Sequence, residues 1–374
     1  MGLLRFLLAM DILISHFPAT SIGRYLFLDD AVAVKTFFIL SGFYISLILS
    51  EKYNTPGGYR VYLTNRFLRL LPVFWVVLLL TIIGSGVSGI FYDNWGRLLP
   101  YLNYWDKMAW EASGYLIISN IFLVGQDLIR FMFLDLADGA LGLTPDYMGH
   151  TPIMATFMFV PQAWSLGIEL VFYAVAPLYV SRDQRLLVIL LVALLGGRYW
   201  FTSMWQLPQE PWKYGFFPFE LSMFILGILA YQVYLKIRDR HIPKSFFWGL
   251  YLFVVLVTLI WDLLPWIAIK TNSYYVLFSL ALPVLFAGRQ DGWLQRKLGD
   301  LSYPIYVSHI LVRDVLLVLC QSSLLVPYVG ILSAIGTLIF SIALHHFIVM
   351  PIETYRQQRA LSIRNNLRYA ALGK

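Results

Sequence analysis

Residues 70–90 read LLPVFWVVLLLTIIGSGVSGI and contain no Asp, Glu, Lys or Arg. A helix of this length is about 30 Å long, which matches the hydrocarbon core of a bilayer. Because backbone polar groups in lipid must be hydrogen-bonded within the chain, a transmembrane helix is expected here. Comparable apolar runs fall at about 3–20, 32–50, 69–90, 159–180, 186–202, 215–235, 246–266, 274–289, 304–320 and 329–350. The sequence therefore predicts an all-α integral membrane protein with about ten transmembrane helices.

The composition agrees with this fold class. Of the 374 residues, 59% are hydrophobic and only 13% are charged, whereas soluble domains carry about 25% charged residues. The net charge of +7 is divided among small Lys and Arg clusters between apolar runs, which is typical of cytoplasmic loops and does not indicate nucleic-acid binding. The single cysteine, Cys320, excludes an internal disulfide and a cysteine-based metal cage, and no metal site is expected.

The distribution of Lys and Arg also predicts the orientation. With both termini in the cytoplasm, most basic residues lie inside, as the positive-inside rule requires. An eleventh candidate for a membrane-spanning helix, residues 114–134, contains Asp127 and Arg130. If it spanned the membrane, the basic loop 236–244 would lie outside. We therefore expect 91–158 to be a long external excursion in which 114–134 is a re-entrant or surface helix.

The chain is expected to contain one domain. Residues 1–355 form the transmembrane domain, and 356–374 form a basic cytoplasmic tail. The first apolar run lacks a preceding basic segment, so we expect it to be a spanning helix and not a cleaved signal.

Ionisable groups inside a membrane are costly and often functional. Arg5 and His16 lie 11 residues apart, which places them on nearly the same helix face with a rise of roughly 16 Å. Arg5 is thus expected at the cytoplasmic edge and His16 near mid-membrane, an arrangement that suits a long ligand with an anionic head. The alternative is a snorkelling arginine and a hydrogen-bonded structural histidine.

A second polar region joins the second and third helices. Gly42, in Ser41-Gly42-Phe43, permits close helix approach. Arg66 and Arg69 are i,i+3 neighbours at the expected cytoplasmic start of the third helix. They could clamp a phosphate or simply set the topology.

The third region is the segment 162–173. Ser165 and Glu169 share a helix face, flanked by Trp164 and Tyr173. A carboxylate at this depth is either protonated or paired with a cation. Glu169 could therefore be a functional carboxyl group, or it could form a structural ion pair with an arginine on another helix.

The fourth region lies in the ninth expected helix. Ser302, Tyr306, His309 and Arg313 are spaced by 4, 3 and 4 residues and form a narrow polar stripe. The stripe could line a cavity or form an internal hydrogen-bonded seam.

These regions together resemble membrane-bound acyltransferase family 3. The resemblance rests on five segments in order, which are Leu4–His16, Phe37–Phe43, Asn65–Pro72, Trp164–Tyr173 and Leu301–His309. It extends over residues 1 to about 355. One departure is Lys35, which stands where many relatives have an acidic residue before the Phe-Phe pair, while Asp29 and Asp30 lie upstream.

The resemblance implies transfer of an acyl group, often acetyl, from cytoplasmic acyl-CoA to a hydroxyl of a carbohydrate or glycosylated acceptor. Donor binding would fall to Arg5, Arg66, Arg69 and Ser41, and catalysis to His16 with Glu169. His16 would act as general base or carry the acyl group covalently. Orienting residues or acceptor-binding residues would be Trp164, Ser165, Tyr173, Tyr306 and His309.

The expected partners are acyl-CoA, the acceptor and membrane lipid, without nucleic acid. Acetyl-CoA or another acyl-CoA is a substrate, and no permanently bound cofactor is expected. By the resemblance, the membrane is a bacterial cytoplasmic (inner) membrane. Two other classes remain open. A proton-coupled secondary transporter also uses intramembrane Arg, His and Glu, although the sequence has no evident internal repeat. A non-catalytic scaffold is the third reading.

Overall fold

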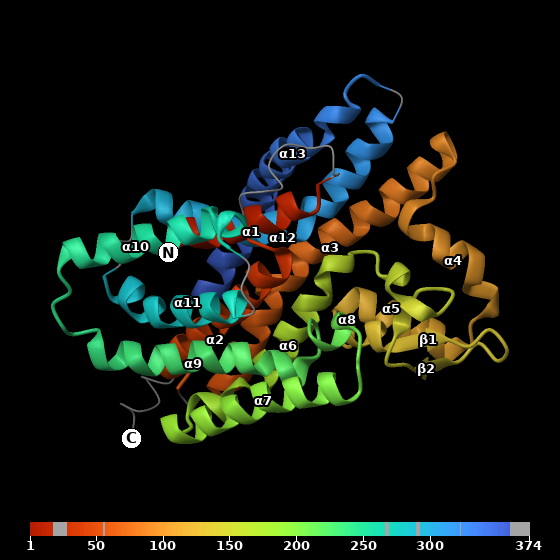
Figure 1. The fold of residues 1–374 in the computed structure, drawn as a ribbon. Helices are drawn as coiled ribbons and strands as arrows, with labels where there is room; N and C mark the ends of the chain where they lie inside the picture. The colour runs from red at the N-terminus through yellow and green to blue at the C-terminus, as the bar shows by residue number, and fades with distance from the viewer. Residues whose placement is uncertain (18–27, 55–56, 266–268, 289–291, 322, 360–374) are drawn as a thin grey trace, which may run out of the picture.

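The computed structural model describes residues 1–17, 28–54, 57–265, 269–288, 292–321 and 323–359 (Figure 1). Its α-helices are α1 (Gly2–Ser15), α2 (Asp30–Glu51), α3 (Gly58–Tyr92), α4 (Leu99–Tyr104), α5 (Trp110–Phe122), α6 (Trp164–Val180), α7 (Gln184–Met204), α8 (Gln209–Trp212), α9 (Phe217–Ile237), α10 (Lys244–Leu259), α11 (Lys270–Ala287), α12 (Trp293–Cys320) and α13 (Val329–Leu344). Two short strands, β1 (Met132–Leu134) and β2 (Leu141–Leu143), form an antiparallel pair.

A helix occurs at each of the ten expected places. Within the described residues, seven helical segments are long and apolar enough to cross a membrane, and they contain α2, α3, α6, α7, α9, α12 and α13. The other three helices, α1, α10 and α11, have 14, 16 and 18 residues. An integral membrane protein built of helices is thus confirmed, whereas the count of ten spans and the cytoplasmic termini stay predictions. Residues 18–20 of the first expected span and 360–374 of the tail lie outside the described residues.

The segment 114–134 differs from the helix expected there. Helix α5 ends at Phe122, because Leu123 adopts a left-handed backbone conformation with φ of 63°. A 3₁₀ turn, Asp127–Phe131, and then β1 follow. The expectation of one helix over 114–134 is therefore wrong beyond Phe122. The polar residues near its end lie in a turn that packs beside α6.

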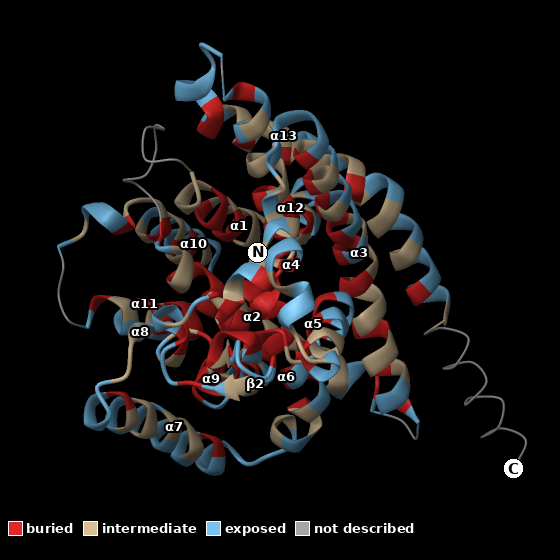
Figure 2. Cartoon of the chain, turned by 90° about the vertical axis from the view of Figure 1, so that its right-hand side faces the viewer, coloured by how far each residue is buried: buried red, intermediate tan, exposed pale blue. Residues whose placement is uncertain are grey.

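Helix α2 forms the centre of the molecule and packs most extensively against α9. Figure 2 shows the buried residues gathered there, while α7 at the periphery is mainly exposed. The two helices approach closely at Gly42 and Gly227. A Cβ atom on Gly42 would lie 2.1 Å from the Phe224 carbonyl oxygen, and one on Gly227 would lie 2.0 Å from that of Ile39. The small residue expected at Gly42 thus allows the backbones to meet.

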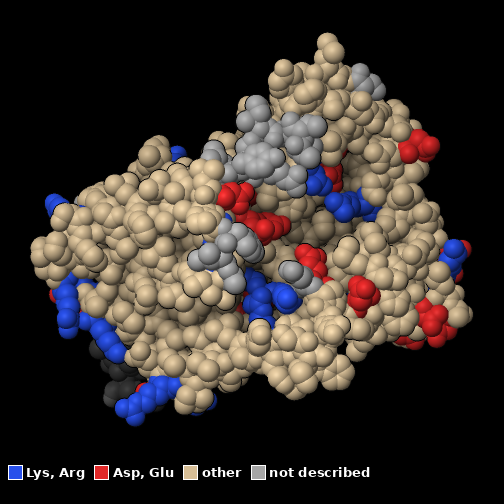
Figure 3. All heavy atoms as spheres, in the orientation of Figure 1, with Lys and Arg blue, Asp and Glu red and all other residues tan. Residues whose placement is uncertain are grey.

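A second group of helices brings the polar residues together. Helix α1 packs along α12, which also contacts α13 and α3. In Figure 1, α3, α12 and α13 run together toward the upper right, away from α7 and α9. Most of the surface in Figure 3 is uncharged, as lipid-facing helices require, but charges of both signs lie in a hollow near the middle of this face.

Candidate active site

A cavity of about 100 Å³ lies between α1, α2, α3, α6 and α12. It brings together eight of the residues that sequence reasoning assigned to donor, catalytic or acceptor functions. They are Arg5, Ser41, Arg66, Arg69, Ser165, Glu169, Tyr173 and Tyr306. We call this space the basic cavity. His16, His309 and Trp164 do not line it, and their positions are described below.

Three arginines give the cavity its charge. The Arg5 Nη2 donates a hydrogen bond to Ser302 Oγ at 3.1 Å. Arg66 is buried against the Tyr173 ring, and its Nε has no hydrogen-bond partner among the described residues. Neither these two side chains nor Arg69 forms an ion pair within the described part of the chain. Clustered guanidinium groups without carboxylate partners favour an anionic ligand, because phosphate accepts paired hydrogen bonds from arginine.

Glu169 is the carboxylate that faces this cavity. Its Oε1 accepts hydrogen bonds from Ser41 Oγ and from the Tyr173 hydroxyl. These two hydrogen bonds hold the side chains of Ser41, Glu169 and Tyr173 in place relative to one another. The structure places neither Glu169 nor Tyr173 in contact with His16, whose carboxylate partner comes from α2.

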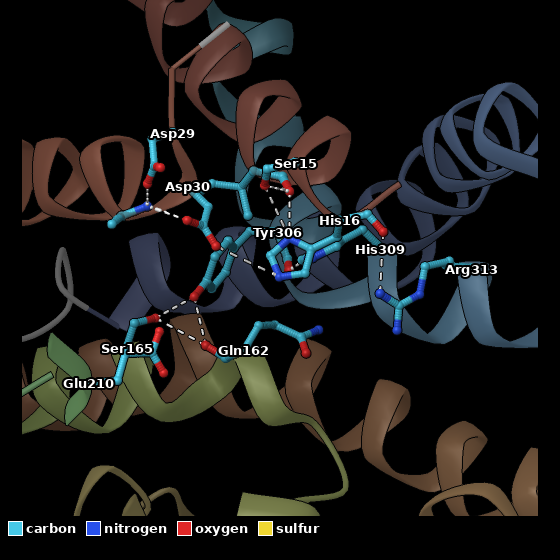
Figure 4. Close-up of polar contacts among 12 residues, drawn as sticks. Ser15, His16, Asp29, Asp30, Gln162, Ser165, Glu210, Tyr306, His309 and Arg313 are labelled. Carbon is cyan, nitrogen blue, oxygen red and sulfur yellow. Dashed lines mark hydrogen bonds and ion pairs between the residues drawn. The ribbon is translucent and has the colours of Figure 1, made fainter. Parts of the chain in front are cut away.

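His16 lies at the end of α1, where its imidazole is oriented by its own helix (Figure 4). Its Nδ1 is 2.8 Å from the Ile12 carbonyl oxygen. A carbonyl only accepts hydrogen bonds, so Nδ1 must carry a proton and Nε2 is the basic nitrogen of the neutral ring. That Nε2 lies 4.0 Å from Asp30 Oδ2, at the start of α2. Sequence reasoning noted Asp30 but gave it no function, since the pairing depends on two helix ends meeting in space.

His309 is oriented in the same way. Its Nδ1 is 2.7 Å from the Tyr306 carbonyl oxygen, and its Nε2 is buried without a partner among the described residues. The His16 and His309 rings have centroids 4.9 Å apart. Arg313, one turn further along α12, donates to the backbone carbonyl of His16 at 3.3 Å. Three members of the polar stripe expected on this helix, Ser302, His309 and Arg313, therefore face α1.

Tyr306 links the basic cavity to the histidine pair. The Tyr306 hydroxyl lies 2.5 Å from Ser165 Oγ and donates to the Gln162 carbonyl oxygen at 2.7 Å. Tyr306 lines the cavity, and its ring is also 6.2 Å from that of His309. This tyrosine is therefore the side chain that connects the arginine cluster with the two imidazoles.

Trp164 has a different neighbourhood from the one expected. Its ring packs 4.8 Å from the Arg130 guanidinium carbon and 4.7 Å from the Tyr214 ring centroid. Arg130 in turn pairs with Glu210 at 2.6 Å. This cluster ties the excursion 91–158 to α6 and to the segment before α9. Sequence reasoning missed it because arginine in a long loop has no periodic signal.

Lys35, the departure from the family pattern, is buried and pairs with buried Glu220 of α9 at 3.3 Å. A buried lysine needs such a partner, because an isolated charge in this environment is costly. The pair therefore accounts for a cation at a position where an acid was expected.

Comparisons with known proteins identify the family of the chain. A family model described as an acyltransferase domain, Acyl_transf_3, matches residues 1–346. A relative from Acidianus two-tailed virus, provisionally named acetyltransferase ORF330, is 27% identical over 177 residues, which are 46% of this chain and 54% of that protein. The match thus spans about half the length of the relative. No solved structure matches the chain. Because the family model matches residues 1–346 of the 374, the chain belongs to acyltransferase family 3.

Proposed function

We propose that the enzyme transfers an acyl group, acetyl in the simplest case, from acyl-CoA to a hydroxyl of a carbohydrate or glycosylated acceptor. The observation that carries this proposal is the orientation of His16. Its Nδ1 proton is held by the Ile12 carbonyl, so Nε2 is left to take a proton, and Asp30 lies beside it. A base of this kind is what an acceptor hydroxyl needs in order to attack a thioester.

The donor would lie in the basic cavity. The phosphates of CoA would be held by Arg5, Arg66 and Arg69, whose guanidinium groups have no carboxylate partners among the described residues. The pantetheine arm would extend along α1 toward Tyr306. We also propose that these arginines face the cytoplasm of a bacterial cell, because acyl-CoA is made there and because the basic loops favour that orientation.

The reaction follows from this placement. The Nε2 of His16 accepts the proton of the acceptor hydroxyl as its oxygen attacks the thioester carbonyl carbon. The tetrahedral intermediate then breaks its C–S bond, and the CoA sulfur takes the proton from His16. Asp30 would stabilise the imidazolium formed between the two steps. A covalent acyl-imidazole on Nε2, followed by transfer to the hydroxyl, uses the same atoms in two displacements.

The test uses the purified protein in lipid with radiolabelled acetyl-CoA, with and without a cell-envelope extract. We expect label in the acceptor fraction for the parent protein, and loss of labelling in His16→Ala by about 10²–10⁴-fold. The matched control is His241→Ala, at an exposed histidine between α9 and α10. Equal labelling by His16→Ala and the parent would overturn the assignment of the base. Absence of both acetyl-CoA binding and labelling would overturn the donor class.

A further inference from the structure

A second cavity, of about 370 Å³, lies beside Gln162. It runs between the second half of α3 and the second half of α12, and we call it the α3–α12 groove. One wall carries hydroxyl groups from Thr81, Ser85 and Ser88, which are spaced by 4 and 3 residues along α3. The facing wall is aliphatic and is formed by Ile310, Leu311, Val315 and Val318 of α12.

The inner end of the groove reaches Gln162, which is next to Tyr306. Gln162 lines it, and the carbonyl oxygen of the same residue accepts the Tyr306 hydroxyl. The Gln162 Nε2 donates to the Val307 carbonyl at 2.7 Å, but its Oε1 is buried without a partner among the described residues. A buried amide oxygen without a partner costs free energy, so the position favours a ligand that donates a hydrogen bond.

The charged groups of the groove already pair with each other. Arg97 and Asp314 form an ion pair at 3.3 Å, and Asp314 also accepts from Arg313, which contacts the His16 carbonyl. An anionic headgroup would therefore find no uncompensated cation here, in contrast to the basic cavity. The lining suits a neutral molecule with hydroxyl groups along one side.

The occupant must also suit the aliphatic wall. Helices α3 and α12 are both long and apolar enough to cross a membrane. A water-soluble sugar would leave the apolar wall against water, whereas a hydrocarbon chain would cover it. We propose that the α3–α12 groove binds the acceptor as a membrane-borne glycolipid, with its hydroxyl-bearing head at Gln162 and its hydrocarbon chain along α12. This inference rests on the proposed function and specifies its acceptor class.

Two glycines of α3 provide a matched test. A Cβ on Gly84, which lines the groove, would meet nothing within 4 Å, so leucine there fills open space. A Cβ on Gly86 would meet only Leu98 Cδ1 at 3.8 Å, an ordinary contact outside the groove lining. The probe is monoglucosyl diacylglycerol with a diazirine in one acyl chain, in phosphatidylcholine nanodiscs. Crosslinked residues are located by mass spectrometry, and acetyl-CoA binding reports that each variant is folded.

We expect crosslinks to α3 and α12 that fall several-fold in Gly84→Leu and persist in Gly86→Leu, with acetyl-CoA binding retained in both. Ser88→Leu is a second groove-filling variant with the same expected result. Equal crosslinking in the Gly84 and Gly86 variants would overturn the proposal. The proposal would also be overturned if a diazirine-labelled phosphatidylcholine crosslinked to the groove as well as the glycolipid probe does and unlabelled glycolipid did not displace it. Displacement of the glycolipid probe by free glucose would overturn it too. Crosslinking needs no turnover, so failure of His16 as the base would leave this result intact.

Discussion

The imidazole rings of His16 and His309 lie with their centroids 4.9 Å apart and their planes inclined by 60°. Each ring has its Nδ1 directed at a backbone carbonyl of its own helix, on Ile12 and Tyr306 respectively. Both Nε2 atoms are consequently left for a substrate or for a neighbouring carboxylate. The pair joins the end of α1 to the middle of α12.

Asp30 should support the base through charge. Asp30→Asn removes the negative charge that faces His16 Nε2 at 4.0 Å and keeps the size of the side chain. A pair at this distance is worth roughly 1 kcal/mol in water and more where water is excluded. Because Asp30 is partly exposed, we expect kcat to fall about tenfold with little change in the donor KM. Steady-state kinetics checks this, with Asp183→Asn at the exposed start of α7 as the control. An unchanged kcat would leave Asp30 with only its hydrogen bond to the Ala31 amide.

His309 should act on the acceptor. His309→Phe keeps an aromatic ring beside His16 but removes the Nε2 that has no partner among the described residues. Losing a hydrogen bond from an acceptor hydroxyl should raise the acceptor KM by about fivefold, since one such bond contributes on the order of 1 kcal/mol. The measurement is the acceptor KM at saturating acetyl-CoA. A normal acceptor KM with reduced thermal stability would instead identify His309 as a packing residue.

The arginines should act on the donor. Arg66→Ala or Arg5→Ala removes a charge-assisted contact with phosphate, which is worth about 1.5–3 kcal/mol. We expect the donor KM to rise by roughly 10- to 100-fold, with a smaller effect on kcat. Arg60→Ala is the matched control, because Arg60 is an exposed arginine at the beginning of the same helix. If Arg60→Ala raises the donor KM as much as Arg66→Ala, general surface charge and not the cavity binds the donor.

The periodic features of this site could be predicted from the sequence. The 11-residue spacing of Arg5 and His16 and the stripe from Ser302 to Arg313 follow from helix geometry, and the structure places them on facing helices. The contact of His16 with Asp30 could not be predicted, because it depends on how separate helix ends meet. The same holds for the Arg130 cluster with Trp164, which joins a loop to a helix.

Helix packing explains another part of the fold that was only partly visible in the sequence. Gly42 indicated a close contact, but not that the partner is α9 at Phe224 and Gly227. Gly42→Ala places a Cβ 2.1 Å from a backbone oxygen, so α2 and α9 must separate. Overpacking of this kind costs typically about 1–3 kcal/mol.

The measurement is thermal unfolding in detergent. Gly249→Ala is the control, because a Cβ there meets nothing within 4 Å and alanine favours the helix. Gly42→Ala should lower the unfolding temperature, and Gly249→Ala should raise it. A Gly42→Ala protein as stable as the parent would show that α2 and α9 can separate at no cost.

Asp127 should make the stability of the excursion depend on pH. It lies in the turn after α5, where burial raises the pKa of its carboxyl to about 6 from a usual value of 3.8, and its Oδ1 has no partner among the described residues. The folded state therefore binds the proton more tightly than the unfolded state does. Stability should rise as the pH falls from about 6 to about 4, by on the order of 2–3 kcal/mol, and then level off. Asp127→Asn should remove this dependence and be at least as stable as the parent at pH 7. Unfolding followed by hydrogen exchange in 110–134 tests this, and a parent protein whose exchange protection in that segment falls between pH 6 and pH 4 would contradict it.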